Sequence, residues 1–259
     1  MKTTRRLIVQ YILTVVLLLS VFFSSCTAGV DPDSSGTNNF SARILVFSAT
    51  KGYRHGSISE GVSALRKLGG KNGFSIDASE DADVFTAENL KKYRVVIFLN
   101  TTGSFFNGSQ KQVFQEFVTQ GGGFVGIHSA TDTFYDWPWY GKMIGGYFKS
   151  HPEIQNATLQ VVNKNHPATA QLPSIWKKRD EWYNFKALSN DINVLITIDE
   201  SSYKGGENGK IHPVSWYHHV AKGRVFYTAL GHTKESYSDE VFLKHLLGGL
   251  KWAMNGGAY

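Results

Sequence analysis

Short apolar runs alternate along the chain with stretches in which apolar residues recur at helical spacing. The runs at 43–48, 74–78, 95–99 and 124–127 predict strands, and those at 95–99 and 124–127 are apolar at successive positions, which is typical of strands covered on both faces. Strands that alternate with helices are typical of parallel β-α-β units with right-handed crossovers. The pattern therefore predicts a single α/β domain with a mostly parallel central sheet and helices on both faces.

Polar motifs mark two expected helix starts. Residues 57–60, Ser-Ile-Ser-Glu, have the form of a capping box and predict a helix through about 68. Residues 109–112 resemble another capping box before a helix that runs to 120. Beyond the centre of the chain the pattern predicts an edge strand at 158–162, strands at 194–199, 212–217 and 223–229, and a final apolar helix at 241–254.

A glycine turn, an apolar strand and a polar loop follow one another in residues 120–132. The strand stops at His128, and Asp132 follows in the same loop. Ligand sites of open α/β sheets lie outside the carboxyl ends of the strands, so both side chains stand where chemistry is expected. Alternatively, His128 only caps the strand by bonding to a neighbouring loop. His55 and His232 also follow predicted strands, which favours a site.

Five residues are the candidates for catalysis: His55, His128, Asp132, Glu181 and His232. If the strand ends meet at one edge of the sheet, they offer imidazoles for proton transfer or nitrogen and carboxylate ligands for a divalent metal. No short motif of the H-E-x-x-H kind accompanies them, so the metal is a hypothesis only.

Aromatic residues are frequent near the same loops. Tyr53, Tyr140, Tyr183 and Trp216 are candidates for a platform that stacks on sugar rings, although ordinary core packing is the alternative for each. Arg54 is a candidate to orient a substrate oxygen, with a solvated loop arginine as the alternative.

The N-terminus has the features of a bacterial lipoprotein signal. Lys2, Arg5 and Arg6 precede the apolar stretch 7–23, and small residues then lead into Cys26. An uncleaved membrane anchor is the alternative, but the apolar stretch is marginal in length for it. We therefore expect residues 1–26 to be the signal peptide and Cys26 to be lipidated. The protein would then be held to the cell envelope only by this lipid, facing the periplasm or the cell surface.

After the signal peptide we expect a tether and then one domain. Residues 27–40 are rich in Gly, Ser, Asp and Asn and predict a flexible tether, and 41–259 form the single domain. Cys26 is the only cysteine, which excludes a disulfide framework or a cysteine nucleophile in the domain.

Removing 1–26 lowers the net charge of +6, and the remaining chain has no basic run, so nucleic acid is not an expected partner. No G-x-G-x-x-G motif follows a strand, which argues against a nucleotide site.

Seven segments in the same order resemble the ThuA-like (trehalose-utilisation) family, and the resemblance covers about residues 43 to 255. The segments are 51–55, 121–133, 139–148, 151–152, 180–181, 212–216 and 223–232. The resemblance implies a flavodoxin-like fold of the class I glutamine amidotransferase-like superfamily. Members of that superfamily carry a cysteine nucleophile on a sharp strand-to-helix turn, where this chain has His128. Amidotransferase chemistry is therefore not expected.

The family resemblance also implies a small-molecule carbohydrate as the ligand, including sugars oxidised to 3-keto derivatives. We expect an enzyme in which His128 removes a proton next to a carbonyl and Asp132 orients the ring. His55 and His232 would donate protons or bind a metal, Glu181 would be a second acid or base, and Tyr183 with Trp216 would shape the pocket. The alternative is a carbohydrate-binding lipoprotein without turnover.

Overall fold

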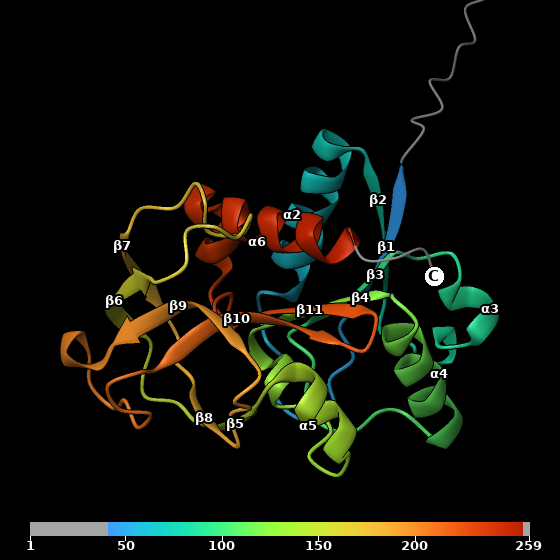
Figure 1. The fold of residues 1–259 in the computed structure, drawn as a ribbon, viewed down its shortest axis with the longest axis horizontal. Helices are drawn as coiled ribbons and strands as arrows, with labels where there is room; N and C mark the ends of the chain where they lie inside the picture. The colour runs from blue at the N-terminus through green and yellow to red at the C-terminus, as the bar shows by residue number, and fades with distance from the viewer. Residues whose placement is uncertain (1–40, 256–259) are drawn as a thin grey trace, which may run out of the picture. The chain divides into compact units, whose positions relative to one another are not determined.

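A mixed sheet of nine strands forms the centre of the domain (Figure 1). The structure is a computed structural model that describes residues 41–255, so the predicted signal peptide, Cys26 and the whole predicted tether lie outside the described residues. The strand order is β2-β1-β3-β4-β11-β10-β9-β6-β7. The parallel half contains β1 (Ala42–Phe47), β2 (Phe74–Ser79), β3 (Val95–Leu99), β4 (Gly123–Ile127) and β11 (Gly223–Thr228).

The other half of the sheet is antiparallel. It contains β10 (Pro213–Val220), β9 (Asn193–Asp199), β6 (Gln155–Val161) and β7 (Ile175–Asp180). Strand β11 joins the halves, because it pairs in parallel with β4 and antiparallel with β10. A separate two-stranded sheet pairs β5 (Tyr147–Ser150) with β8 (Asn184–Lys186).

Helices cover both faces of the parallel half (Figure 1). On one face lie α2 (Ile58–Asn72) and α6 (Glu240–Met254), and on the other α4 (Gly108–Thr119) and α5 (Pro138–Ile144), with the short α3 (Ala87–Leu90) beside α4. Every residue of β3 and β4 is buried, as expected for strands covered on both sides. Four 3₁₀ turns complete the fold: η1 (Ala82–Val84), η2 (His128–Thr131), η3 (Glu200–Ser202) and η4 (Lys234–Ser238).

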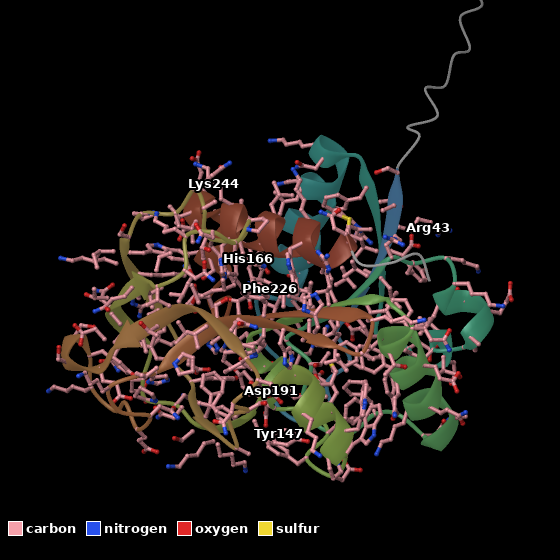
Figure 2. The ribbon with its side chains drawn as sticks, viewed as in Figure 1. Arg43, Tyr147, His166, Asp191, Phe226 and Lys244 are labelled. Atoms are coloured by element: carbon pink, nitrogen blue, oxygen red, sulfur yellow. The ribbon has the colours of Figure 1, made fainter. Side chains whose placement is uncertain are left out.

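The orientation of side chains on the last helix shows how the layers pack. Phe226 of β11 and His166 lie in the interior on the α6 side of the sheet, whereas Lys244 extends outward from α6 (Figure 2). The α/β fold with a mostly parallel core is therefore confirmed. Within residues 41–255, no helix combines the length and the apolar character that a membrane span requires.

Three local expectations were wrong. The hydroxyl of Ser57 donates to the carbonyl of Gly231 and does not cap α2, which continues to Asn72. The capping box of α4 is formed by Asn107 and Gln110, not by residues 109–112. The strand expected at the edge is β6, which pairs on both sides, so β7 is the edge strand.

Candidate active site

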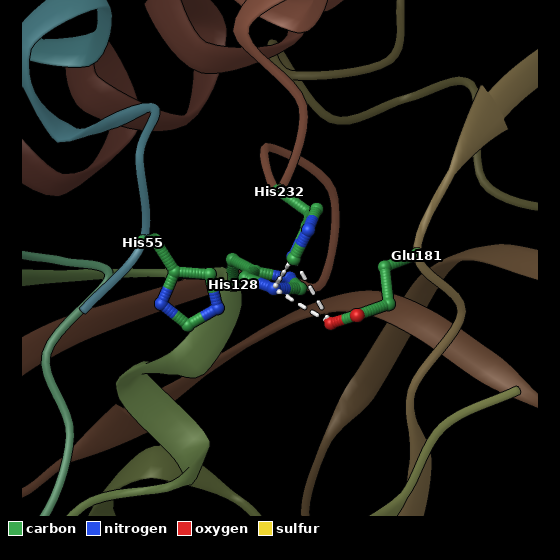
Figure 3. Close-up of side chains that lie close together, drawn as sticks. All are labelled: His55, His128, Glu181 and His232. Atoms are coloured by element: carbon green, nitrogen blue, oxygen red, sulfur yellow. Dashed lines mark hydrogen bonds and ion pairs between the residues drawn. The ribbon is translucent and has the colours of Figure 1, made fainter. Parts of the chain in front are cut away.

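Four of the five predicted catalytic side chains meet at the carboxyl edge of the parallel strands (Figure 3). His55 follows β1, His128 follows β4 and His232 follows β11, while Glu181 follows β7 of the antiparallel half. One nitrogen or oxygen atom from each residue lies within 4.8 Å of those of the other three. We call these four residues the histidine–glutamate cluster.

The backbone and the ring of His128 are both tightly constrained. Its φ of 51° lies in the left-handed region, which is uncommon outside glycine and is typical of strained functional turns. Nδ1 is 2.7 Å from the carbonyl oxygen of Ala229. Because a carbonyl only accepts, Nδ1 donates to it, and Nε2 is the ring atom that faces the other residues of the cluster. That Nε2 atom is 3.1 Å from Nδ1 of His232 and 3.3 Å from Oε2 of Glu181.

Glu181 binds imidazoles with both carboxylate oxygens. Oε2 is 3.0 Å from Nδ1 of His232, and Oε1 is 3.1 Å from Nδ1 of His151. Burial raises the pKa of Glu181, but the hydrogen bonds and charges of His128 and His232 outweigh it, and the pKa lies well below its ordinary value. The carboxylate is therefore ionised at neutral pH.

His55 is the most strongly perturbed imidazole of the cluster. Burial, and then the charges of His128 and His232, lower its pKa to about 2. Its ring stands edge-on to those of His128 and His232, at centroid distances of 4.8 and 5.1 Å. A neutral ring at this place has a lone pair to offer to a proton or a metal ion.

The loop that carries His232 is fixed by a buried carboxylate. Gly231 has a φ of 109°, which favours glycine, and its N–H donates to Oδ2 of Asp180 over 3.0 Å. Asp180 also accepts from the N–H of Thr233 and the hydroxyl of Ser236. These bonds hold the backbone on both sides of His232 in place.

A pocket of about 410 Å³ opens above the cluster. This volume lies in the usual range for small-molecule sites. Both halves of the domain contribute to its walls, which are formed by Tyr53, His55, Asp132, Phe148, His151, Pro152, Glu153, Ile154, Glu181, Tyr183 and His232. Three aromatic rings and several carboxyl and imidazole groups thus face one cavity.

Tyr53 and Tyr183 have the positions expected of sugar-contacting residues. Tyr53 lines the pocket and is 66% exposed. Tyr183 also lines it and packs its ring 4.2 Å from that of His128, measured between centroids. Burial raises the pKa of the Tyr183 hydroxyl well above its ordinary value, so the group stays protonated.

Three other predicted substrate contacts were wrong. Trp216 is fully buried and donates from Nε1 to the carbonyl of Ile144, and Tyr140 is fully buried and donates to the carbonyl of Ala130. Both are core residues whose polar tips are satisfied internally. Arg54 forms a two-bond ion pair with Glu80 at 2.7 and 2.8 Å and does not line the pocket.

The expected pairing of Asp132 with His128 is also corrected. Asp132 lines the pocket and accepts a hydrogen bond of 2.8 Å from the hydroxyl of Tyr135, whereas the ring of His128 is oriented by Ala229 and faces Glu181. Burial raises the pKa of Asp132, and the Tyr135 hydrogen bond only partly opposes this. His128 is fully buried and lies behind the residues that line the pocket.

The sequence reasoning missed His151 and Phe148 as pocket residues. His151 faces Glu181 from the segment after β5, and its Nδ1 also lies 3.0 Å from the carbonyl of Pro152. The signal that could have found it is the His-Pro pair at 151–152, which is one of the segments that resemble the ThuA-like family. Because His151 does not follow a predicted parallel strand, the position of strand ends in the sequence could not predict that it lies in the pocket.

The comparisons with known proteins agree with this fold. Residues 43–253 match the ThuA family, described as trehalose utilisation. A ThuA-like protein from Bacteroides uniformis is 25% identical with a TM-score of 0.70, and covers 82% of this chain and 91% of its own. A second ThuA-like protein, from Parabacteroides merdae, is 21% identical with a TM-score of 0.69, and covers 83% of this chain and 90% of its own.

Part of a larger enzyme shares the fold. A β-galactosidase from Rahnella sp. R3 is 15% identical with a TM-score of 0.55, over 81% of this chain and 31% of that one, which shows the fold alone. The sequence matches no curated protein. Because the family match covers nearly the whole described domain, the chain belongs to the ThuA family, whose described role is trehalose utilisation, and its function lies in carbohydrate use.

Proposed function

We propose that the protein is an enzyme that removes a proton next to the carbonyl group of an oxidised sugar, such as a 3-keto disaccharide. The observation that supports this most directly is the pocket itself. It brings three imidazoles and three carboxyl groups to one cavity with aromatic walls, at the edge of the sheet where α/β enzymes bind substrates.

Asp132 is the base in this proposal. Its carboxylate faces the pocket, and burial raises its pKa toward the working pH, which strengthens it as a proton acceptor. The hydroxyl of Tyr135 holds the group in place. His128, which was first expected to be the base, is fully buried, and its ring nitrogens contact Ala229, His232 and Glu181 behind the pocket wall.

In this proposal the histidine–glutamate cluster stabilises the negative charge that forms when Asp132 removes the proton. As the α-proton leaves, negative charge develops on the carbonyl oxygen of the sugar, and groups that stabilise this charge lower the barrier. His232 and His55 line the pocket at the floor where that oxygen would lie. Tyr53, Phe148 and Tyr183 would contact the faces of the sugar rings.

A carbohydrate-binding protein without turnover is the second candidate. Exposed Tyr53 and the aromatic walls suit that function equally well. However, sugar binding alone does not need several imidazoles packed against a buried, ionised glutamate, which is the arrangement that favours the enzyme.

Proton abstraction can be measured directly by NMR in D₂O. We expect the protein to exchange the protons next to the carbonyl of a 3-keto disaccharide or to convert it to product, and to leave trehalose unchanged. Asp132→Asn should lower the rate by about 10²- to 10⁴-fold, because it removes a positioned base. Asp191→Asn, at an exposed site outside the pocket (Figure 2), is the matched control and should keep the wild-type rate.

One outcome would reject the enzyme, and another would reject only the role of Asp132. Saturable binding of the keto sugar without exchange or product would establish the binding protein instead. Wild-type activity in Asp132→Asn would leave the carbohydrate chemistry in place but remove Asp132 as its base.

A further inference from the structure

We propose that the imidazoles of His55, His128 and His232 and the carboxylate of Glu181 bind one divalent transition-metal ion at the floor of the pocket. Binding of the ion does not depend on the sugar chemistry. Only the catalytic role of the ion rests on the proposed function.

The ring nitrogens and the carboxylate oxygen of the cluster converge on one place. Nδ1 of His128 donates to the carbonyl of Ala229, so Nε2 is the ring atom that faces Oε2 of Glu181 at 3.3 Å and Nδ1 of His232 at 3.1 Å. A cation held between these atoms would contact all of them at once.

The distances match the spacing of ligands around an ion. The three atom pairs among His128, Glu181 and His232 are 3.0, 3.1 and 3.3 Å apart. Metal bonds of about 2.1 Å place neighbouring ligand atoms about 3.0 Å apart in an octahedral site and about 3.4 Å apart in a tetrahedral one. His55 turns one ring nitrogen toward the same point and supplies the fourth ligand (Figure 3).

Hydrogen bonds behind the cluster hold the ligands as they do in metal sites. Ligating histidines usually donate their second nitrogen to a carbonyl or a carboxylate, and ligating carboxylates are hydrogen-bonded in turn. Here Ala229 accepts from His128, the hydroxyl of Ser129 lies 3.4 Å from Nδ1 of His55, and His151 contacts Oε1 of Glu181. The outer contacts of His128, His55 and Glu181 therefore leave one atom of each of these three residues directed inward.

The type of ligand selects the class of ion. Imidazole nitrogens suit Zn²⁺, Fe²⁺, Co²⁺ and Ni²⁺, and a carboxylate is compatible with each, whereas Mg²⁺ and Ca²⁺ prefer all-oxygen sites. His128 is buried while the other three ligands also line the pocket, so one side of the ion would face the cavity. An ion there could polarise the carbonyl oxygen of a bound sugar.

The test is metal binding, measured without any sugar. The purified protein is stripped with chelator, loaded separately with Zn²⁺, Mn²⁺ and Co²⁺ salts, and analysed for bound ion and by calorimetry. We expect one tightly bound ion per chain, and absorption bands of Co²⁺ in a nitrogen-rich site. Because loss of an outer hydrogen bond already lowers affinity about 10- to 100-fold, His128→Ala and Glu181→Gln should lower it by about 100-fold or more.

Matched variants separate ligation from folding. His219→Ala changes an exposed histidine of β10 and should bind as the wild type does. Circular dichroism checks each fold, and if His128→Ala does not fold, Glu181→Gln, which preserves size, and His55→Ala take its place. An ion content near zero with all three cations, or equal affinity in the wild type and the ligand variants, would overturn the proposal. An ion that binds without any proton exchange on keto sugars would instead count against the proposed function alone.

Discussion

His245 is a neutral imidazole enclosed in the core, remote in sequence from the cluster. It lies on α6, with Nδ1 2.9 Å from the carbonyl of Ala168 and Nε2 3.1 Å from the hydroxyl of Ser215. Burial lowers its pKa to about 4, although the hydrogen bond to Ala168 acts in the opposite direction. The folded protein therefore keeps this ring neutral at pH values where an unfolded chain protonates it.

This difference predicts a loss of stability in mild acid. Between pH 6.5 and about 4 the unfolded state binds the proton first, so the free energy of unfolding falls as pH falls, by about 3 kcal/mol from this group. His245→Asn keeps a donor for Ala168 and should flatten the curve in this window, whereas exposed His219→Asn should not. Urea unfolding at several pH values measures the free energy of unfolding. If that free energy changes with pH equally in the wild type and in His245→Asn, the prediction is contradicted.

At the scale of residues, the sequence predicts a side chain best where a strand ends. His55, His128 and His232 each follow a parallel strand, and the sheet brings such ends together whatever the packing around them. Trp216 and Tyr140 could not be placed in this way, because the residues next to an aromatic side chain in the sequence do not show whether its ring is buried in the core or contacts a sugar. Only the packing against α5 and η2 distinguishes them.

At the scale of elements, β7 and the loop after β11 act as one unit. Asp180, the last residue of β7, is fully buried and accepts from Gly231, Thr233 and Ser236, which surround His232. Lys178 lies 3.9 Å away and partly balances its charge. Strand β7 thus fixes the loop that follows β11, and it places Glu181 next to His232 in that loop.

Asp180→Asn tests this connection. The amide loses the charge and one acceptor, and we expect a loss of about 1–3 kcal/mol in the free energy of unfolding. Metal affinity should fall about 10- to 100-fold, because the loop that carries His232 would be displaced. Glu235→Gln, an exposed acid-to-amide change in the same loop, is the control and should alter neither. Lower stability with unchanged affinity would mean that Asp180 supports the fold without positioning His232.

The parallel elements were predictable and the antiparallel ones only in part. Strands β3 and β4 and most of β1 are continuous apolar runs, because both of their faces are covered. Strand β7 carries charged residues at four of its positions, and its buried side includes Lys178 and Asp180, so its sequence resembles a loop. β5 and β8 are short and paired with each other, and no period of apolar residues marks them.

At the scale of the whole molecule, the attachment of the chain remains a prediction from sequence. Cys26 is expected to carry lipid, and fatty-acid labelling with mass spectrometry of the membrane fraction measures this directly. We expect labelled wild-type protein whose chain begins at Cys26, and no label in Cys26→Ala. Ser25→Ala keeps a small residue before the cysteine and is the matched control. An unlabelled wild-type protein would contradict the lipoprotein.

The order of strands in the sheet differs from their order in the chain, and this affects how the protein folds during synthesis. Strand β11 lies between β4 and β10 but is the last strand to be made. Until it inserts, one edge of β4 has no partner and can pair with another chain. Pairing of strands so distant in sequence is slow. The sheet therefore stays incomplete during synthesis until β11 has emerged, and the open edge of β4 is exposed for that time.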